Sequence, residues 1–210
     1  MKNTAIANQT SNKTKIPSSR LTTREALIRC GVELCTQSGF QATGIEEVLQ
    51  RVNVPKGSFY HYFRNKREFG KQVINSYAEY FQLKLARHFT NAALSPLDRL
   101  RAFIDEAQAG MMKFEYKRGC LVGNLGQELA GLDEEFRQSL EHVLLSWEQQ
   151  TAACFREAQL QKHLNNKQDP ELLAAVFWIG WEGAILRSKL TKSNKPMQLF
   201  ADFFLESLQR

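Results

Sequence analysis

The positions of proline constrain the fold of this chain more than any other sequence feature. Four of the five prolines, Pro55, Pro96, Pro170 and Pro196, stand where an apolar pattern of helical period begins. Proline fits the first turn of a helix but breaks a helix further along. Two of these four prolines follow a serine or an aspartate, which are favoured N-cap residues. Strand-like alternation is almost absent, so the sequence predicts an all-α protein.

Nine helical segments are expected from the apolar spacing and from signals at the helix ends. Gly39 is a typical C-cap for the first segment. Thr43, with Glu46 three residues later, has the form of a capping box at the start of the second. The expected segments are 23–38, 43–52, 56–63, 66–89, 95–114, 121–130, 133–160, 171–192 and 196–208.

These segments divide the chain into three parts. We expect a flexible polar tail over residues 1–20, a three-helix unit over 21–70 and a larger helical body over 71–210. No apolar run approaches the ~20 residues that a membrane span needs. The first residues also lack the apolar centre of a signal peptide. We therefore expect a cytoplasmic protein without membrane contacts.

Positive charge is concentrated in the first third of the chain. Residues 1–72 hold twelve Lys and Arg against five Glu, whereas the other 138 residues hold sixteen bases against seventeen acids. A basic unit attached to a near-neutral body favours contact with a polyanion. A solvated basic surface would give the same count, so charge alone leaves both interpretations open.

Residues 44–63 have the plan of a helix-turn-helix. Two short expected helices are joined by the break Asn53-Val54-Pro55. In such motifs the second helix enters the major groove of DNA. Spacing by four places Phe59 and Phe63 on one face, which is expected to pack inward against the preceding helix.

The other face of this second helix carries groups suited to DNA. Ammonium, hydroxyl and imidazole groups donate hydrogen bonds to phosphates and base edges, and a glycine lets the backbone approach closely. The residues expected at the DNA are Lys56, Gly57, Ser58, Tyr60, His61 and Tyr62. Thr43 and Lys66 flank the two helices and are expected to hold phosphates.

The stretch VPKGSFYHYFRNK, residues 54–66, closely resembles the recognition helix of the TetR family of bacterial regulators. The resemblance covers residues 20–70 and includes Gly39-Phe40, Thr43-Gly44-Ile45 and Val48. It implies an N-terminal helix-turn-helix domain and a C-terminal domain for ligand binding and dimerisation. It also implies a homodimeric repressor of transcription that binds a palindromic operator in double-stranded DNA and releases it when a small-molecule inducer binds.

Two motifs in the body resemble one branch of this family. RGCLVGNL, residues 118–125, and WEGAILRSK, residues 181–189, are similar to motifs of the N-ethylmaleimide-type and acrylate-type repressors, which respond to reactive electrophiles. The resemblance implies that Cys120 and Lys189 sense the inducer.

Cys120 also has chemical arguments of its own. It follows Lys117 and Arg118 and stands at the start of an expected helix. Both circumstances lower the pKa of a thiol and increase its reactivity. A buried, unreactive cysteine is the alternative interpretation, and it is the interpretation preferred for Cys30, Cys35 and Cys154.

The inducer pocket is expected to be apolar and walled by helices. Its candidate lining residues are Phe103, Met111, Phe114, Tyr116, Phe177, Trp178 and Trp181. The dimer surface is expected on the helices around 134–160 and 171–191. Gly180, Gly183 and Ala184 would let two helices approach closely, either between subunits or within one.

No cofactor, metal site or enzymatic activity is expected. The four cysteines form no CxxC pair. The four histidines show no triad or metal spacing, and there is no phosphate-binding glycine loop. Three alternatives stay open: a transcriptional activator, a regulator with a non-covalent ligand, and a sequence-independent DNA-binding protein.

Overall fold

The computed structural model describes residues 22–208, and every regular element within that range is a helix, which confirms the all-α prediction. The expected tail therefore lies outside the described residues. The α-helices are α1 (Thr23–Ser38), α2 (Ile45–Val52), α3 (Phe59–Tyr62), α4 (Lys66–Phe89), α5 (Pro96–Lys113), α6 (Leu121–Leu129), α7 (Glu134–Leu160), α8 (Pro170–Thr191) and α9 (Lys195–Ser207). A 3₁₀ turn, η1 (Lys56–Ser58), leads into α3.

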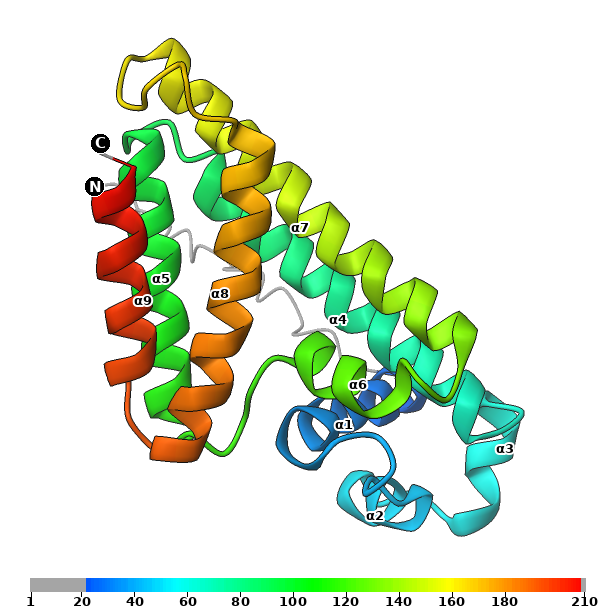
Figure 1. Ribbon diagram of the computed structural model, residues 1–210. Coiled ribbons are helices and arrows are strands. Elements are labelled where there is room, and N and C mark those ends of the chain that lie inside the picture. The colour runs from blue at the N-terminus through cyan, green and yellow to red at the C-terminus, as the bar shows by residue number, and fades with distance from the viewer. Residues whose placement is uncertain (1–21, 209–210) are drawn as a thin grey trace, which may run out of the picture.

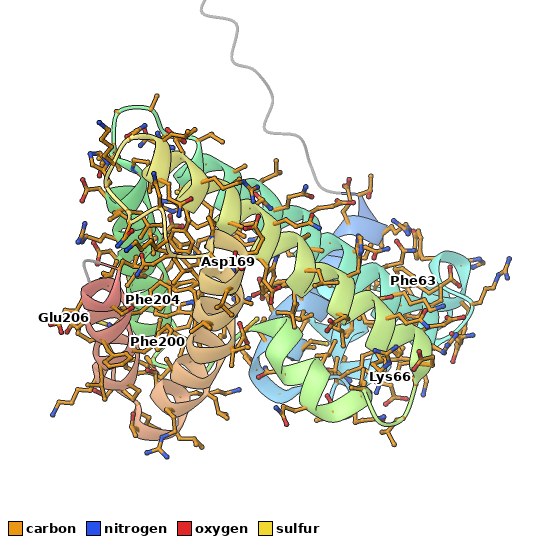
Figure 2. The ribbon with its side chains drawn as sticks, turned by 45° about the horizontal axis from the view of Figure 1, so that its top comes forward. Phe63, Lys66, Asp169, Phe200, Phe204 and Glu206 are labelled. Carbon is orange, nitrogen blue, oxygen red and sulfur yellow. The ribbon has the colours of Figure 1, made fainter. Side chains whose placement is uncertain are left out.

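Two long helices connect the ends of the molecule. Figure 1 shows α1, α2 and α3 gathered at one end, with α5, α8 and α9 at the other and α4 and α7 running between them. The helix α7 packs against both α4 and α8, and α8 packs against α9. Figure 2 shows the same separation, since Phe63 and Lys66 lie far from Phe200 and Phe204. The short helix α6 packs against both α1 and α7, so it joins the N-terminal helices to the body.

Capping side chains start the helices where the sequence predicted them. Ser95 accepts a hydrogen bond from the amide of Asp98, and Asp169 accepts from the amides of Glu171 and Leu172. Each of these two caps stands directly before a proline at the first helical position. A cap of this kind contributes about 1 kcal/mol to helix stability.

The predicted capping box at Thr43 is wrong. Gly44 is the N-cap of α2, and no side chain caps this end. Thr43 is buried, and its hydroxyl donates instead to the carbonyl of Gly39 at 2.6 Å. The carbonyls at the end of α1 lack helical partners, and the Thr43 hydroxyl satisfies one that lies just beyond it.

Aromatic rings fill the centre of the body. The Trp147 and Trp178 rings stand 4.9 Å apart, and Phe177 and Trp181 stack at 5.7 Å. All four of these side chains are at most 2% exposed. Aromatic pairs at such distances stabilise a core by about 1 kcal/mol each beyond their burial, so this cluster fixes the positions of α7 and α8.

Candidate functional site

The α2–α3 pair forms the expected helix-turn-helix. Asn53 ends α2 in the left-handed conformation with φ 57°, which asparagine tolerates better than most residues. Phe59 and Phe63 are buried and pack on Phe69 of α4, with ring centroids 5.4 and 5.0 Å apart. The inward-facing pair predicted from the spacing is confirmed, and α4 supplies a third ring to this small core.

The remaining side chains of α3 point outward. Tyr60 is 65% exposed and Tyr62 37% exposed, and His61 is also exposed. Gly57 is exposed as well, and an added Cβ there would meet no atom within 4 Å. Since packing within the chain does not require glycine at position 57, the open backbone suits the close approach of another molecule.

Two further residues predicted at the DNA lie beside α3. Lys56 is exposed and pairs with Glu46 of α2, while Ser58 is half-buried. An exposed ion pair is worth little in water. The Lys56 ammonium can therefore exchange Glu46 for a phosphate at small cost.

The two predicted phosphate contacts differ in the structure. The Lys66 ammonium lies 4.9 Å from the centroid of the Phe40 ring and donates to the carbonyl of Gln41 at 3.1 Å. It stays half-buried at the start of α4. The Thr43 hydroxyl, in contrast, is buried and directed at Gly39, so the predicted hydroxyl–phosphate contact is wrong for this conformation.

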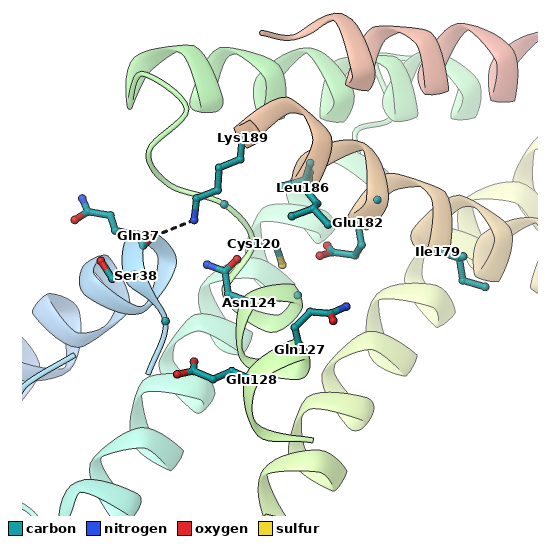
Figure 3. Close-up of a pocket in the computed structure, with 15 residues that line it drawn as sticks. Gln37, Ser38, Cys120, Asn124, Gln127, Glu128, Ile179, Glu182, Leu186 and Lys189 are labelled. Atoms are coloured by element: carbon teal, nitrogen blue, oxygen red, sulfur yellow. Dashed lines mark hydrogen bonds between the residues drawn. The ribbon is translucent and has the colours of Figure 1, made fainter. Parts of the chain in front are cut away.

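A cavity of about 560 Å³ lies between α6 and α8 and reaches the end of α1; we call it the α6–α8 cavity. Figure 3 shows Cys120, Asn124, Glu182 and Lys189 around it. A smaller cavity of about 190 Å³, which we call the central cavity, lies between α4, α5 and α8. Both cavities are lined by Gly119, Cys120, Glu182 and Ile185.

Cys120 is the N-cap of α6 and is 7% exposed. The Tyr77 hydroxyl lies 3.8 Å from its sulfur, and the Glu182 carboxylate lies beside it in Figure 3. Burial, followed by the negative charge of Glu182, raises the pKa of the Cys120 thiol well above its ordinary value. The thiol is therefore protonated at neutral pH.

The predicted lowering of the Cys120 pKa by neighbouring cations is wrong. Arg118 directs its Nε to the Thr36 hydroxyl at 2.9 Å and stacks over the Phe114 ring. Lys117 is exposed and pairs with Glu115. Both cations stand next to Cys120 in the chain, but their charges are directed elsewhere.

Lys189 lines the α6–α8 cavity together with Cys120, a proximity that the sequence could not give. Its ammonium is directed away from the sulfur, toward the end of α1, where it donates to the carbonyl of Gln37 at 2.9 Å. Burial lowers its pKa. Lys189 therefore contacts the N-terminal helices directly.

The predicted pocket residues divide into two groups. Phe103, Met111, Phe114 and Trp181 line the central cavity. Phe177 and Trp178 belong to the packed aromatic cluster instead, and Tyr116 is half-buried against the core. For these last three, the side chains fill the body rather than line either of the two cavities.

The sequence reasoning missed Tyr77, Lys84 and Glu182. Tyr77 and Lys84 face the central cavity from α4, and Glu182 faces both cavities from α8. Glu182 had a signal, because it is an acid inside the apolar run between Trp178 and Ile185. An acid in such a run is rarely buried without a partner or a function.

Helix α6 is tied to the end of α1 by hydrogen bonds. The Glu128 carboxylate accepts from the amides of Phe40 and Gln41 at 2.7 and 2.5 Å. Asn124 donates its side-chain amide to the carbonyls of Cys35 and Thr36. A shift of α6 would therefore move or strain the end of α1.

The other cysteines are core residues, as predicted. Cys30, Cys35 and Cys154 are buried and free, and burial raises the pKa of each thiol. Among residues 22–208, no group of three or more His, Cys, Asp or Glu is arranged to hold a metal ion. Within the same range, no helix is long and apolar enough to cross a bilayer.

Comparison with known families matches both parts of the chain. The family model described as "Bacterial regulatory proteins, tetR family" matches residues 27–73. A second model, described as "Tetracyclin repressor-like, C-terminal domain", matches residues 96–204.

Two curated relatives are similar to this chain over most of its length. The chain is 48% identical over 180 residues to the transcriptional regulator AcuR of Cereibacter sphaeroides, covering 86% of this chain and 82% of that protein. It is 28% identical over 176 residues to the transcriptional repressor NemR of Escherichia coli, covering 84% of this chain and 88% of that protein.

Solved structures of regulators of the same family are similar to this one. A regulatory protein TetR from Rhodobacter sphaeroides has a TM-score of 0.85 and 47% identity, covering 88% of this chain and 97% of that one. The reduced form of E. coli NemR has a TM-score of 0.79 and 26% identity, covering 89% and 97%. These matches confirm the resemblance to the AcuR-like and NemR-like branch. The chain belongs to the TetR family of bacterial transcriptional regulators, with a DNA-binding helix-turn-helix, and is a regulator rather than an enzyme.

Proposed function

We propose that this protein is a homodimeric repressor, acting in the cytoplasm, that leaves a palindromic operator when a small electrophile adds to Cys120. One observation carries the proposal. Cys120 caps α6 and lines two cavities, while α6 is hydrogen-bonded to the end of α1. A change at the sulfur therefore has a direct route to the DNA-binding helices.

The DNA contact in this proposal is made by the outer face of α3 and η1. This face carries Lys56, Tyr60, His61 and Tyr62, and Gly57 leaves the backbone open. The excess positive charge of residues 1–72 supports the same assignment, since phosphate contacts dominate affinity for DNA. We assign Lys66 a phosphate contact from its place at the start of α4.

The homodimer in this proposal forms through α8 and α9. Exposed apolar side chains repeat at helical spacing along α8 and continue on α9. The sequence predicted the dimer surface on α7 and α8, so this proposal keeps α8 and replaces α7 by α9. These side chains, which we call the apolar stripe, are Leu172, Val176, Ile179, Leu186, Leu190, Leu199 and Phe203. A contiguous exposed apolar surface of this kind is typical of a protein interface.

The two glycines of α8 differ in whether they make room within one subunit or between subunits. An added Cβ at Gly180 would collide with the Phe200 ring, so Gly180 makes room for α9 within one subunit. An added Cβ at Gly183 would meet nothing within 4 Å. Gly183 lies between Ile179 and Leu186 on the apolar stripe, which supports close approach of a second subunit there.

The apolar stripe borders the inducer site in this proposal. Ile179, Gly183 and Leu186 also line the α6–α8 cavity. An adduct at Cys120 would then act on α6 and on the dimer surface together. It would favour dimers whose recognition helices are wrongly spaced for successive major grooves, which lie about 34 Å apart.

A regulator with a non-covalent ligand is the second candidate. The observation that favours it is the burial of Cys120, because burial raises the pKa of the thiol and so disfavours the nucleophilic thiolate. Incubation with N-ethylmaleimide followed by mass spectrometry separates the two candidates. A single adduct on Cys120 supports the covalent version, and an unmodified Cys120 in protein that still responds to an inducer contradicts it.

DNA selection tests the operator. Random duplexes selected by the protein should converge on a palindrome with half-sites about 10 bp apart, and transcription from a template carrying it should fall when protein is added. Binding without sequence preference would contradict the proposal in favour of a sequence-independent binder. Increased transcription would identify an activator.

A further inference from the structure

We propose that Glu182 is the base that takes the thiol proton of Cys120 as the sulfur adds to an electrophilic carbon–carbon double bond, and that it returns this proton to the neighbouring carbon. The inference rests on the proposed function and names the residue that makes the thiol react. The class of ligand is an α,β-unsaturated carbonyl compound small enough for the cavities beside Cys120.

The two side chains come from different helices and meet at one point. Cys120 is the N-cap of α6, and Glu182 lies in the middle of α8. Figure 3 shows the Glu182 carboxylate directed at the Cys120 side chain. Gly123 permits this approach, because an added Cβ there would collide with Oε2 of Glu182 and stand 3.8 Å from Cβ of Cys120.

One oxygen of the carboxylate has no hydrogen-bond partner within residues 22–208 that would explain its position. Its Oε1 atom is buried and has no hydrogen-bond partner among the described residues. Leaving a charged oxygen buried without a partner costs free energy, so such groups are retained where they act on a ligand or a proton. Both cavities that contain Cys120 also contain Glu182, so a ligand that reaches the sulfur reaches the carboxylate as well.

The thiol needs such a base. The usual activation of a cysteine by nearby cations is missing, since Arg118 and Lys117 are directed elsewhere. Burial raises the pKa of Glu182 to about 7. A base titrating near neutral pH is the effective kind, because it is still ionised and yet holds a proton well.

The reaction adds the thiol across the C=C bond without consuming the carboxylate. The Glu182 carboxylate removes the proton from sulfur while the sulfur lone pair forms a C–S bond to the β-carbon. The π electrons of the C=C bond move to the carbonyl group as an enolate. The protonated Glu182 then gives the proton to the α-carbon, so hydrogen and sulfur have added across the double bond and the carboxylate is restored.

Among residues 22–208, Glu182 is the only carboxylate whose charge acts on the Cys120 thiol. From α4, Tyr77 places a neutral hydroxyl 3.8 Å from the sulfur, and Lys84 lines the central cavity and pairs with Glu106. Glu128 of α6 is bound to the amides of Phe40 and Gln41. Lys189 and Arg118 are bound to Gln37 and Thr36.

The test measures the rate of adduct formation by N-ethylmaleimide at Cys120 from pH 5.5 to 9, in wild type, Glu182→Gln and Glu182→Asp. In wild type the rate constant should rise with pH and level off above about pH 7, as Glu182 becomes ionised. Glu182→Gln should react about 100-fold more slowly at neutral pH and lose this inflection. Glu182→Asp, which keeps the carboxylate, should recover part of the rate.

A faster rate of adduct formation in Glu182→Gln would overturn the inference. Glu182 also raises the pKa of the thiol through its negative charge, so a purely electrostatic role predicts that Glu182→Gln reacts faster than wild type. An equal or higher rate in Glu182→Gln contradicts the base role and leaves the covalent version of the proposed function intact. If wild type forms no adduct, the base role of Glu182 and the covalent version of the proposed function both fail. Glu134→Gln is the matched control, since Glu134 is exposed and pairs within α7; its rate should equal that of wild type, and thermal melts of each variant verify folding.

Discussion

The carboxylate of Glu128, near the end of α6, accepts a hydrogen bond from the backbone amide of Phe40 at 2.7 Å. Its second oxygen accepts from the amide of Gln41. These amides lie in the turn between α1 and α2, so one side chain of the body holds the turn that leads into the helix-turn-helix. Hydrogen bonds to a charged acceptor are about twice as strong as neutral ones, so Glu128 is a strong tie between α6 and this turn.

Glu128→Gln should weaken this tie, because a neutral side-chain carbonyl replaces two charged acceptor oxygens. We expect the free energy of unfolding in urea to fall by about 1–2 kcal/mol. We also expect the inducer to reduce operator affinity less in the variant than in wild type. Glu134→Gln is the control, since Glu134 is exposed and pairs within α7. Equal inducer responses in Glu128→Gln and wild type would remove Glu128 from the coupling route.

Lys56→Ala should weaken operator binding and its dependence on salt. If the ammonium contacts one phosphate, the slope of log affinity against log salt should fall by about 1. Lys117→Ala removes another exposed, ion-paired lysine, which lies outside the helix-turn-helix, and should leave the slope unchanged. Fluorescence anisotropy from about 50 to about 300 mM salt measures both slopes. An unchanged slope for Lys56→Ala would rule out the phosphate contact.

Phe203→Glu should dissociate the proposed homodimer. Phe203 is 69% exposed on α9 in one subunit, and burying a charge in an apolar interface is costly. The dimer dissociation constant should increase more than about 30-fold in analytical ultracentrifugation. Leu83→Glu places the same charge on an exposed apolar position of α4 and should have no such effect. A dimer that survives Phe203→Glu would place the interface elsewhere.

Glu182 should make stability depend on pH. The pKa of its carboxyl is about 7 in the folded protein against 4.5 ordinarily, so the folded state binds the proton more tightly. The contribution is present below pH 4.5 and is lost as pH rises through 7. The free energy of unfolding of wild type relative to Glu182→Gln should therefore fall by about 2 kcal/mol from pH 5 to pH 8. A pH-independent difference would show that the carboxyl is solvated.

The helix boundaries could be predicted because their signals are local. Ser95-Pro96, Asp169-Pro170 and the spacing of Phe59 from Phe63 depend only on neighbours along one helix. The capping box predicted at Thr43 was wrong because its hydroxyl donates to the carbonyl of Gly39, and α2 begins after Gly44 without a side-chain cap.

The chemistry of Cys120 could not be predicted in the same way. The pKa of a thiol depends on the charges around it in space, and the nearest sequence neighbours, Lys117 and Arg118, are directed away. The group that matters, Glu182, follows sixty-two positions later on another helix. Only the fold brings the two together, by placing the start of α6 beside the middle of α8.

The central claim is that chemistry at Cys120 controls DNA binding, and one titration tests it most directly. Operator anisotropy is measured for wild type and Cys120→Ser at increasing N-ethylmaleimide, with the fraction of modified Cys120 determined on the same samples. The account predicts that wild type leaves the operator in proportion to Cys120 modification, whereas Cys120→Ser stays bound. Release of Cys120→Ser at the same concentrations, or full modification of wild type without release, would contradict it.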